Sequence, residues 1–287
     1  CGKKPTTATR TSADFWLAFR VLESLQFVSG LPWQTEGEAS LVDALSGQGV
    51  KFRRNRLSDH ELASRNVADH PVVVLLLPIL GDNDLTDELR IRLAHLASFD
   101  TFRECAIVVV AHGDRHVSDE FVTTDTPFSI KVRRLFSGVG IIEMLETKLD
   151  RFTAASLARE ILDFVDATSL RDVHELNSIA RLLPRAPRWH TRRRLLDFYD
   201  PCTGSSLLKP AERTTLKRIG RHIQVIAPSV LKMTHAGLGD DALADLGEAL
   251  HSEVIDLGSN YFSWGELVPQ LGTCRWLGLA ANGLTRM

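Results

Sequence analysis

Two runs of consecutive apolar residues, separated by a stretch with helical spacing, most constrain how this 287-residue chain can fold. Val72–Leu77 lies between Pro71 and Pro78, and Ala106–Val110 is the second run. Apolar runs of this length without alternation are typical of strands buried on both faces of a parallel sheet. The leucines between them fall on one face of a helix, at Leu85, Leu89, Leu93 and Leu96. The sequence therefore predicts a strand–helix–strand unit with a right-handed crossover.

The neighbouring segments extend this unit into a larger sheet. Gly47–Arg54 alternates apolar and polar residues, which predicts an edge strand. Helices are predicted at Phe128–Phe136, Ile141–Leu149 and Thr153–Val165. Alternation of helices and strands along the chain favours an α/β fold, a three-layer sandwich with a mainly parallel central sheet.

A second α/β unit is predicted near the C-terminus. Arg221–Ala227 and Glu253–Leu257 have the composition of strands, and Ala242–Leu250 that of a helix between them. We identify no internal repeat. The predicted domains are a polar tail, an α/β core domain, a helical and basic linker and a C-terminal α/β subdomain, at 1–13, 14–168, 169–215 and 216–287.

Composition excludes several classes of protein. A net charge of −2 argues against a surface that binds nucleic acid in general. No apolar run approaches the roughly 18 residues of a membrane span. Four cysteines without metal-ligand spacing predict no metal site, fit a reducing compartment and favour the cytoplasm. We predict no cofactor. The first residues, CGKKPTTATRTS, resemble the start of a bacterial lipoprotein anchored through Cys1, and the alternative is a chain cut from a longer one.

The carboxyl ends of the two buried strands are the predicted site. Ligands of open parallel sheets bind outside these ends. His112 and Gly113 follow the second strand, where an imidazole can serve as general acid or base or bond a neighbouring loop. The residues predicted to bind a ligand at the same edge are Gly81, Asp82, Asn83, Asp84 and Asp114.

The motifs NDLTDEL, IVVVAHGD and PFSIKVRRLF, over about Val72–Phe136, resemble the core of caspase-type cysteine proteases. The resemblance implies that His112 is catalytic and that Gly113 donates to an oxyanion. Ala111 replaces the usual serine, and the family's Gln-Ala-Cys-Arg-Gly motif is absent. Ser156 lies in a stretch with helical spacing, so we predict that it is in a helix and is not a nucleophile. The resemblance therefore implies a non-proteolytic homologue.

Two alternatives use the same strands. The order of strands resembles that of TIR domains. This resemblance implies an NAD hydrolase with Glu88 as its catalytic carboxylate. Alternatively, Glu88 is a carboxylate that interacts with the positive end of a helix. GDND resembles a block of SGNH-type esterases, in which Asn83 would hold an oxyanion. That family's Gly-Asp-Ser nucleophile is absent before Gly81.

The sequence thus favours a non-proteolytic binding or scaffold module on a caspase-like core, with a protein partner. Hydrolases that use Glu88 or His112 are the alternatives. Arg185–Arg194 carries five arginines and Trp189, and it is predicted to be a solvated linker or a site for an acidic partner or RNA.

Overall fold

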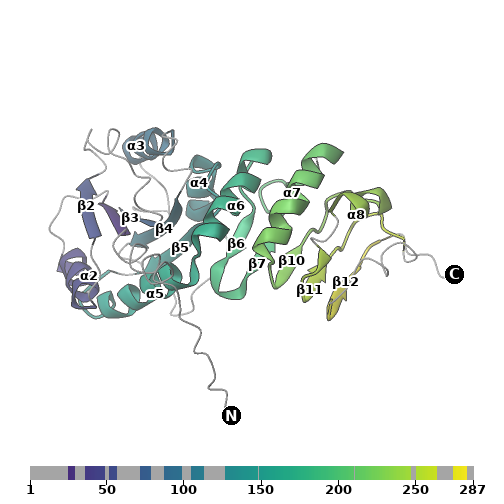
Figure 1. The fold of residues 1–287 in the computed structure, drawn as a ribbon. Coiled ribbons are helices and arrows are strands. Elements are labelled where there is room, and N and C mark those ends of the chain that lie inside the picture. The colour runs from purple at the N-terminus through teal and green to yellow at the C-terminus, as the bar shows by residue number, and fades with distance from the viewer. Residues whose placement is uncertain are drawn as a thin grey trace, which may run out of the picture.

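A computed structural model gives the architecture of the chain. It describes residues 25–29, 36–48, 52–56, 72–78, 87–98, 105–112, 127–147, 149–209, 211–246, 250–263 and 274–282. Two five-stranded sheets follow one another along the chain and lie side by side (Figure 1).

The first sheet contains only parallel strands in the order β2-β1-β3-β4-β5. Its strands are β1 (Leu25–Ser29), β2 (Phe52–Arg56), β3 (Val72–Pro78), β4 (Ala106–His112) and β5 (Ile142–Thr147). Its helices are α2 (Glu36–Gly47), α3 (Asp87–Ala97), α4 (Pro127–Leu135) and α5 (Ala154–Ala167). The predicted α/β fold with a parallel central sheet is confirmed.

The predicted buried strands β3 and β4 form the centre of this sheet. Val73, Leu75, Val108 and Val110 are all fully buried, as predicted. Alternate residues of the two strands pack on opposite faces because strand side chains alternate. One face packs against α2 and α5, and the other against α3 and α4. The layers are therefore helix, sheet and helix.

The second sheet has the order β12-β11-β10-β7-β6, with only β6 antiparallel to its neighbour. Its strands are β6 (Arg188–His190), β7 (Leu195–Asp197), β10 (Val230–Lys232), β11 (Val254–Asp256) and β12 (Trp276–Gly278). Its helices are α6 (Leu170–Leu182), α7 (Arg213–Ile226) and α8 (Asp240–Leu246), and smaller elements are η4 (Thr191–Arg193), β8 (Tyr199–Asp200) and β9 (Ser205–Ser206). The helices α6, α7 and α8 lie along one side of this sheet (Figure 1).

Two element predictions are wrong. The helix predicted at Ile141–Leu149 is absent, since residues 142–147 pair with β4 and form β5. The strand predicted at Arg221–Ala227 is instead the end of α7, whose buried residues Leu216, Ile219, Ile223 and Ile226 follow helical spacing. The strand prediction rests on a window too short to show that spacing. Ser156 lies within α5, as predicted.

The predicted domain boundaries stay a prediction. Residues 169–215, predicted as a linker, contain α6, β6, η4 and β7. One apolar core runs from α2 and the first sheet through α5 and α6 to Leu231 and Ile255 of the second sheet. No described helix has both the length and the apolarity to cross a membrane.

An ion pair joins α7 to α8 and predicts an acid-sensitive contact. Arg213 Nε donates to Asp245 Oδ2 over 2.8 Å, and Lys217 Nζ lies 3.4 Å from Asp245 Oδ1. The hydrogen bond from Arg213 lowers the pKa of Asp245 below its ordinary value of 3.8. A lowered folded-state pKa stabilises the fold above the ordinary value, and the stabilisation is lost as pH falls through the folded-state pKa.

We therefore expect Arg213→Gln to reduce the steepness with which stability falls below about pH 4. The measurement is urea denaturation of both proteins from pH 7 to pH 3. Arg218→Gln, on an exposed part of the same helix, is the control. Equal acid dependence of the stability in wild type and Arg213→Gln would show that Arg213 does not lower the pKa of Asp245.

Candidate functional site: the strand face of the second sheet

The second sheet contains four parallel strands that start at residues 195, 230, 254 and 276. The helix α7 lies between the first and second of them in the chain, and α8 lies between the second and third. The middle residues Leu196, Leu231 and Ile255 are fully buried toward the helices. The flanking residues of these strands are only partly buried. The sheet thus has one face against its helices and one face toward solvent.

The side chain of Asn260 forms hydrogen bonds to the segment after β10 and to the segment after β11. Its Oδ1 accepts from the amides of Ala236 and Leu238, both at 3.1 Å. Its Nδ2 donates to the carbonyls of Met233 at 2.8 Å and Leu257 at 2.9 Å. The side chain is almost fully buried. One amide side chain therefore satisfies backbone groups of two successive units, as buried backbone groups require.

Asn282 has the same role one unit later. Its Oδ1 accepts from Phe262 N at 3.1 Å, and its Nδ2 donates to Leu257 O at 2.9 Å and Leu279 O at 3.1 Å. Both asparagines end the same pattern, Ile255-x-Leu257-x-x-Asn260 and Leu277-x-Leu279-x-x-Asn282. This pattern, with a strand in each repeat of roughly 20–29 residues, is typical of leucine-rich repeats. The prediction that the chain has no internal repeat is wrong.

The register of the strands arranges the solvent side in two rows. The first row is apolar across four strands and contains Leu195, Val230, Val254 and Trp276. The second row alternates in charge before it ends in glycine, and contains Arg188, Asp197, Lys232, Asp256 and Gly278. Opposite charges on neighbouring strands stabilise such a row.

Trp276 is the largest apolar side chain on this face, and 54% of it is exposed. A Cβ on Gly278 would lie 2.7 Å from the indole Cη2, so the ring covers the Gly278 backbone. Gly278 is therefore the residue that leaves room for the indole. We name the two rows together the strand face.

Most arginines of the basic segment Arg185–Arg194 form ion pairs within the chain. Arg192 pairs with Asp163 at 3.2 Å, and Arg194 pairs with Asp172 at 3.0 Å and lies over the Trp189 ring. Arg185 pairs with Asp200. Salt bridges of this kind leave Arg192 and Arg194 less able to contact an acidic partner or RNA.

Two glutamates lie near this segment. Burial raises the pKa of Glu143, and the guanidinium groups of Arg133 and Arg192 act in the opposite direction. Burial also raises the pKa of Glu160, which Arg192 opposes. Arg133 therefore lies near the carboxylate of Glu143 in β5, and Arg192 lies near the carboxylates of Glu143 and of Glu160 in α5.

The sequence-predicted site is only partly covered by the described residues. His112 ends β4, and Glu88 is the second residue of α3, but their side chains lie outside the described part of the chain. Gly113 also lies outside it, as do all five predicted ligand-binding residues, Gly81, Asp82, Asn83, Asp84 and Asp114. The structure does not test whether these residues form a ligand site. Sequence reasoning missed the strand face, although the spacing of Asn260 and Asn282 was a signal for it.

No model of a known protein family matches the sequence, and no curated protein matches it. Solved structures similar to about half of the chain are flavodoxins and related proteins. A mutant flavodoxin from Pseudomonas aeruginosa is 18% identical, with 49% of this chain and 97% of that chain covered and a TM-score of 0.34. Megasphaera elsdenii flavodoxin is 11% identical, with 47% of this chain and 98% of that chain covered and a TM-score of 0.32. General stress protein 14 of Treponema denticola, solved in complex with FMN, is 15% identical, with 50% of this chain and 98% of that chain covered and a TM-score of 0.34.

This finding overturns the predicted resemblance to caspase-type proteases and to TIR domains, because the structures found are flavodoxin-like. The functions that followed from the resemblance are wrong with it. These are a scaffold on a caspase-like core, an NAD hydrolase that uses Glu88 and a hydrolase that uses His112.

Proposed function

We propose that this chain recognises a protein partner through the strand face of its second sheet, which together with its helices we call the repeat unit. The observation that carries the proposal is the repeated asparagine bonding, which holds successive parallel strands in register with one face toward solvent. Stacked repeats of this kind present extended binding surfaces. The proposal concerns the second sheet and does not depend on the first.

The chemistry of the strand face favours a peptide or protein with apolar side chains. An apolar row that ends in a half-exposed tryptophan provides an anchor, since tryptophan is enriched among the residues that contribute most to binding. The adjacent charged row contains two positive and two negative residues, so it offers no net charge to nucleic acid. The charged row can instead orient a partner, through polar groups of the partner's backbone or through charges on the partner that complement the row.

The test is quantitative capture of bound proteins from an extract of the source organism. We expect Trp276→Ala to weaken capture of any specific partner about tenfold or more, because truncation of a tryptophan that anchors an interface costs on the order of 2 kcal/mol. Leu170→Ala, on α6 and 43% exposed, is the matched apolar control and should leave capture unchanged. Equal capture by wild type, Trp276→Ala and Val254→Glu would contradict the proposal.

A second candidate function rests on the strand order of the first sheet. In the order 2-1-3-4-5 the direction of winding reverses between β1 and β3, and flavodoxin binds FMN at this point. α2 begins seven residues after Ser29, and the sequence between them includes Gly30 and Thr35. Helix amides, a glycine and hydroxyl groups are the donors that a phosphate requires, so these residues fit in their chemistry. The FMN would supply redox chemistry, and Ser29 and Thr35 would bind its phosphate.

We expect FMN fluorescence to be quenched on addition of the chain, with weaker quenching of riboflavin, which lacks the phosphate. Ser29→Ala and Thr35→Ala together should weaken FMN binding about tenfold and leave riboflavin binding unchanged, since each lost charged hydrogen bond costs roughly 1 kcal/mol or more. Fluorescence titration measures both. No quenching at millimolar protein would exclude this candidate.

A further inference from the structure

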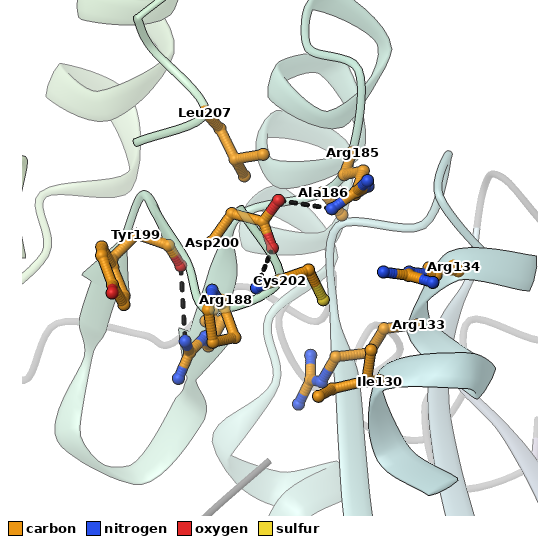
Figure 2. Close-up of a pocket in the computed structure, with 11 residues that line it drawn as sticks. Ile130, Arg133, Arg134, Arg185, Ala186, Arg188, Tyr199, Asp200, Cys202 and Leu207 are labelled. Carbon is orange, nitrogen blue, oxygen red and sulfur yellow. Dashed lines mark hydrogen bonds and ion pairs between the residues drawn. The ribbon is translucent and has the colours of Figure 1, made fainter. Parts of the chain in front are cut away.

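A small pocket that opens to solvent lies where the first sheet and its helices meet the second sheet. Its walls come from α4, from the start of β6 and the segment before it, from β8 and the turn after it, and from Leu207. Four arginines line it, namely Arg133, Arg134, Arg185 and Arg188. Figure 2 shows their side chains around the Cys202 thiol.

The lining of the pocket carries more positive than negative charge. Asp200 is the one carboxylate among the described residues that line it, and it pairs with Arg185. The same carboxylate also accepts from Cys202 N at 3.0 Å and from Thr203 Oγ1 at 3.1 Å. Asp200 is therefore committed to its own turn and to Arg185, and it does not neutralise Arg134.

Two of the arginines are placed to receive an anion. Arg188 is oriented by a hydrogen bond from its Nη2 to Tyr199 O at 3.4 Å, as Figure 2 shows. Arg134 is exposed at the end of α4 and has no ion-pair partner within the described part of the chain. Ile130, Ala186 and Leu207 provide an apolar wall beside them.

We propose that this pocket binds a phosphate monoester, whose dianion matches the guanidinium groups of Arg134 and Arg188 and whose organic group lies against the apolar wall. Arginine suits this ligand because its planar donors bind phosphate oxygens in pairs. The pocket borders the strand face through Arg188, but a small phosphate ester needs only the pocket. The two proposals can therefore fail separately.

The first test measures binding of phenyl phosphate by calorimetry. We expect Arg134→Gln to weaken binding at least fivefold, with the melting temperature unchanged, and a rise in salt to weaken it further. Arg171→Gln, exposed on α6, is the control and should bind as wild type does. Benzyl alcohol, which has the ring without the charge, should not bind. Equal binding by Arg134→Gln and wild type, or of the alcohol and the phosphate, would overturn the proposal.

A second readout uses the thiol in the pocket. Cys202 is exposed, and phenyl phosphate should slow its alkylation by iodoacetamide without slowing that of Cys274, measured by mass spectrometry of the peptides. Unchanged alkylation of Cys202 at saturating phenyl phosphate would also overturn the proposal. A phosphotyrosine peptide compared with phenyl phosphate identifies the source of the ligand: tighter peptide binding assigns the site to a phosphorylated protein, and equal binding to a small phosphate ester. Either result supports a phosphate site.

Discussion

Asn260→Ala is expected to lower the free energy of unfolding by about 4 kcal/mol. The substitution leaves three backbone groups without their side-chain partner, the amides of Ala236 and Leu238 and the carbonyl of Met233. The carbonyl of Leu257 keeps its hydrogen bond from Asn282. A buried polar group that loses its partner costs on the order of 1–3 kcal/mol, and Asn260 is only 2% exposed. Urea denaturation followed by far-UV circular dichroism measures the change.

Two variants separate hydrogen bonding from packing. Asn260→Leu keeps the approximate volume and removes all the bonds, so it should be about as unstable as the alanine variant. Asn282→Ala removes three bonds from a half-buried position, so it should cost less, about 2 kcal/mol. If Asn260→Ala cost less than about 1 kcal/mol, the asparagine would not be what joins the successive units.

The first sheet was predictable at its centre because burial there follows from an uninterrupted local pattern. β3 and β4 are apolar along nearly their whole length, and both faces are covered by helices. β5 was not predictable in the same way. Glu143 and Glu146 interrupt its apolar residues, and pairing with β4 determines its conformation. A short window of sequence contains no trace of that partner.

The repeat unit escaped prediction for a different reason. Its strands are three residues long, too short for the alternation of side chains to show in the sequence. The information lay in a longer comparison, since Ile255-x-Leu257-x-x-Asn260 recurs as Leu277-x-Leu279-x-x-Asn282. A search for self-similarity would have found both the fold of this unit and the candidate strand face.

The pocket at the junction was not predictable from local patterns at all. Arg134 and Arg188 are far apart in the chain, and only the contact between the two sheets brings α4 and β6 to the same pocket. The basic segment stands out in the sequence, but its sequence does not tell which arginines pair internally. Arg192 and Arg194 do so, with carboxylates of α5 and α6.

That contact between the sheets depends on Gly140. The glycine precedes β5, and its amide donates to Asn177 Oδ1 of α6 over 2.6 Å. A Cβ on residue 140 would overlap the carbonyl carbon of Leu176 and would lie 2.6 Å from Asn177 N. These are backbone atoms inside a helix, which cannot move aside as the end of a flexible side chain can.

We therefore expect Gly140→Ala to lower the free energy of unfolding by about 4 kcal/mol or more, or to prevent folding, because overpacking against backbone moves a whole helix. A loss of this size corresponds to a fall in melting temperature of roughly 8–16 °C for a domain of about 150–250 residues. Gly239→Ala is the matched control, since nothing lies within 4 Å of a Cβ at that glycine. Differential scanning calorimetry of both variants measures the effect. A Gly140→Ala protein that melts within about 2 °C of wild type would mean that α6 does not approach the first sheet this closely.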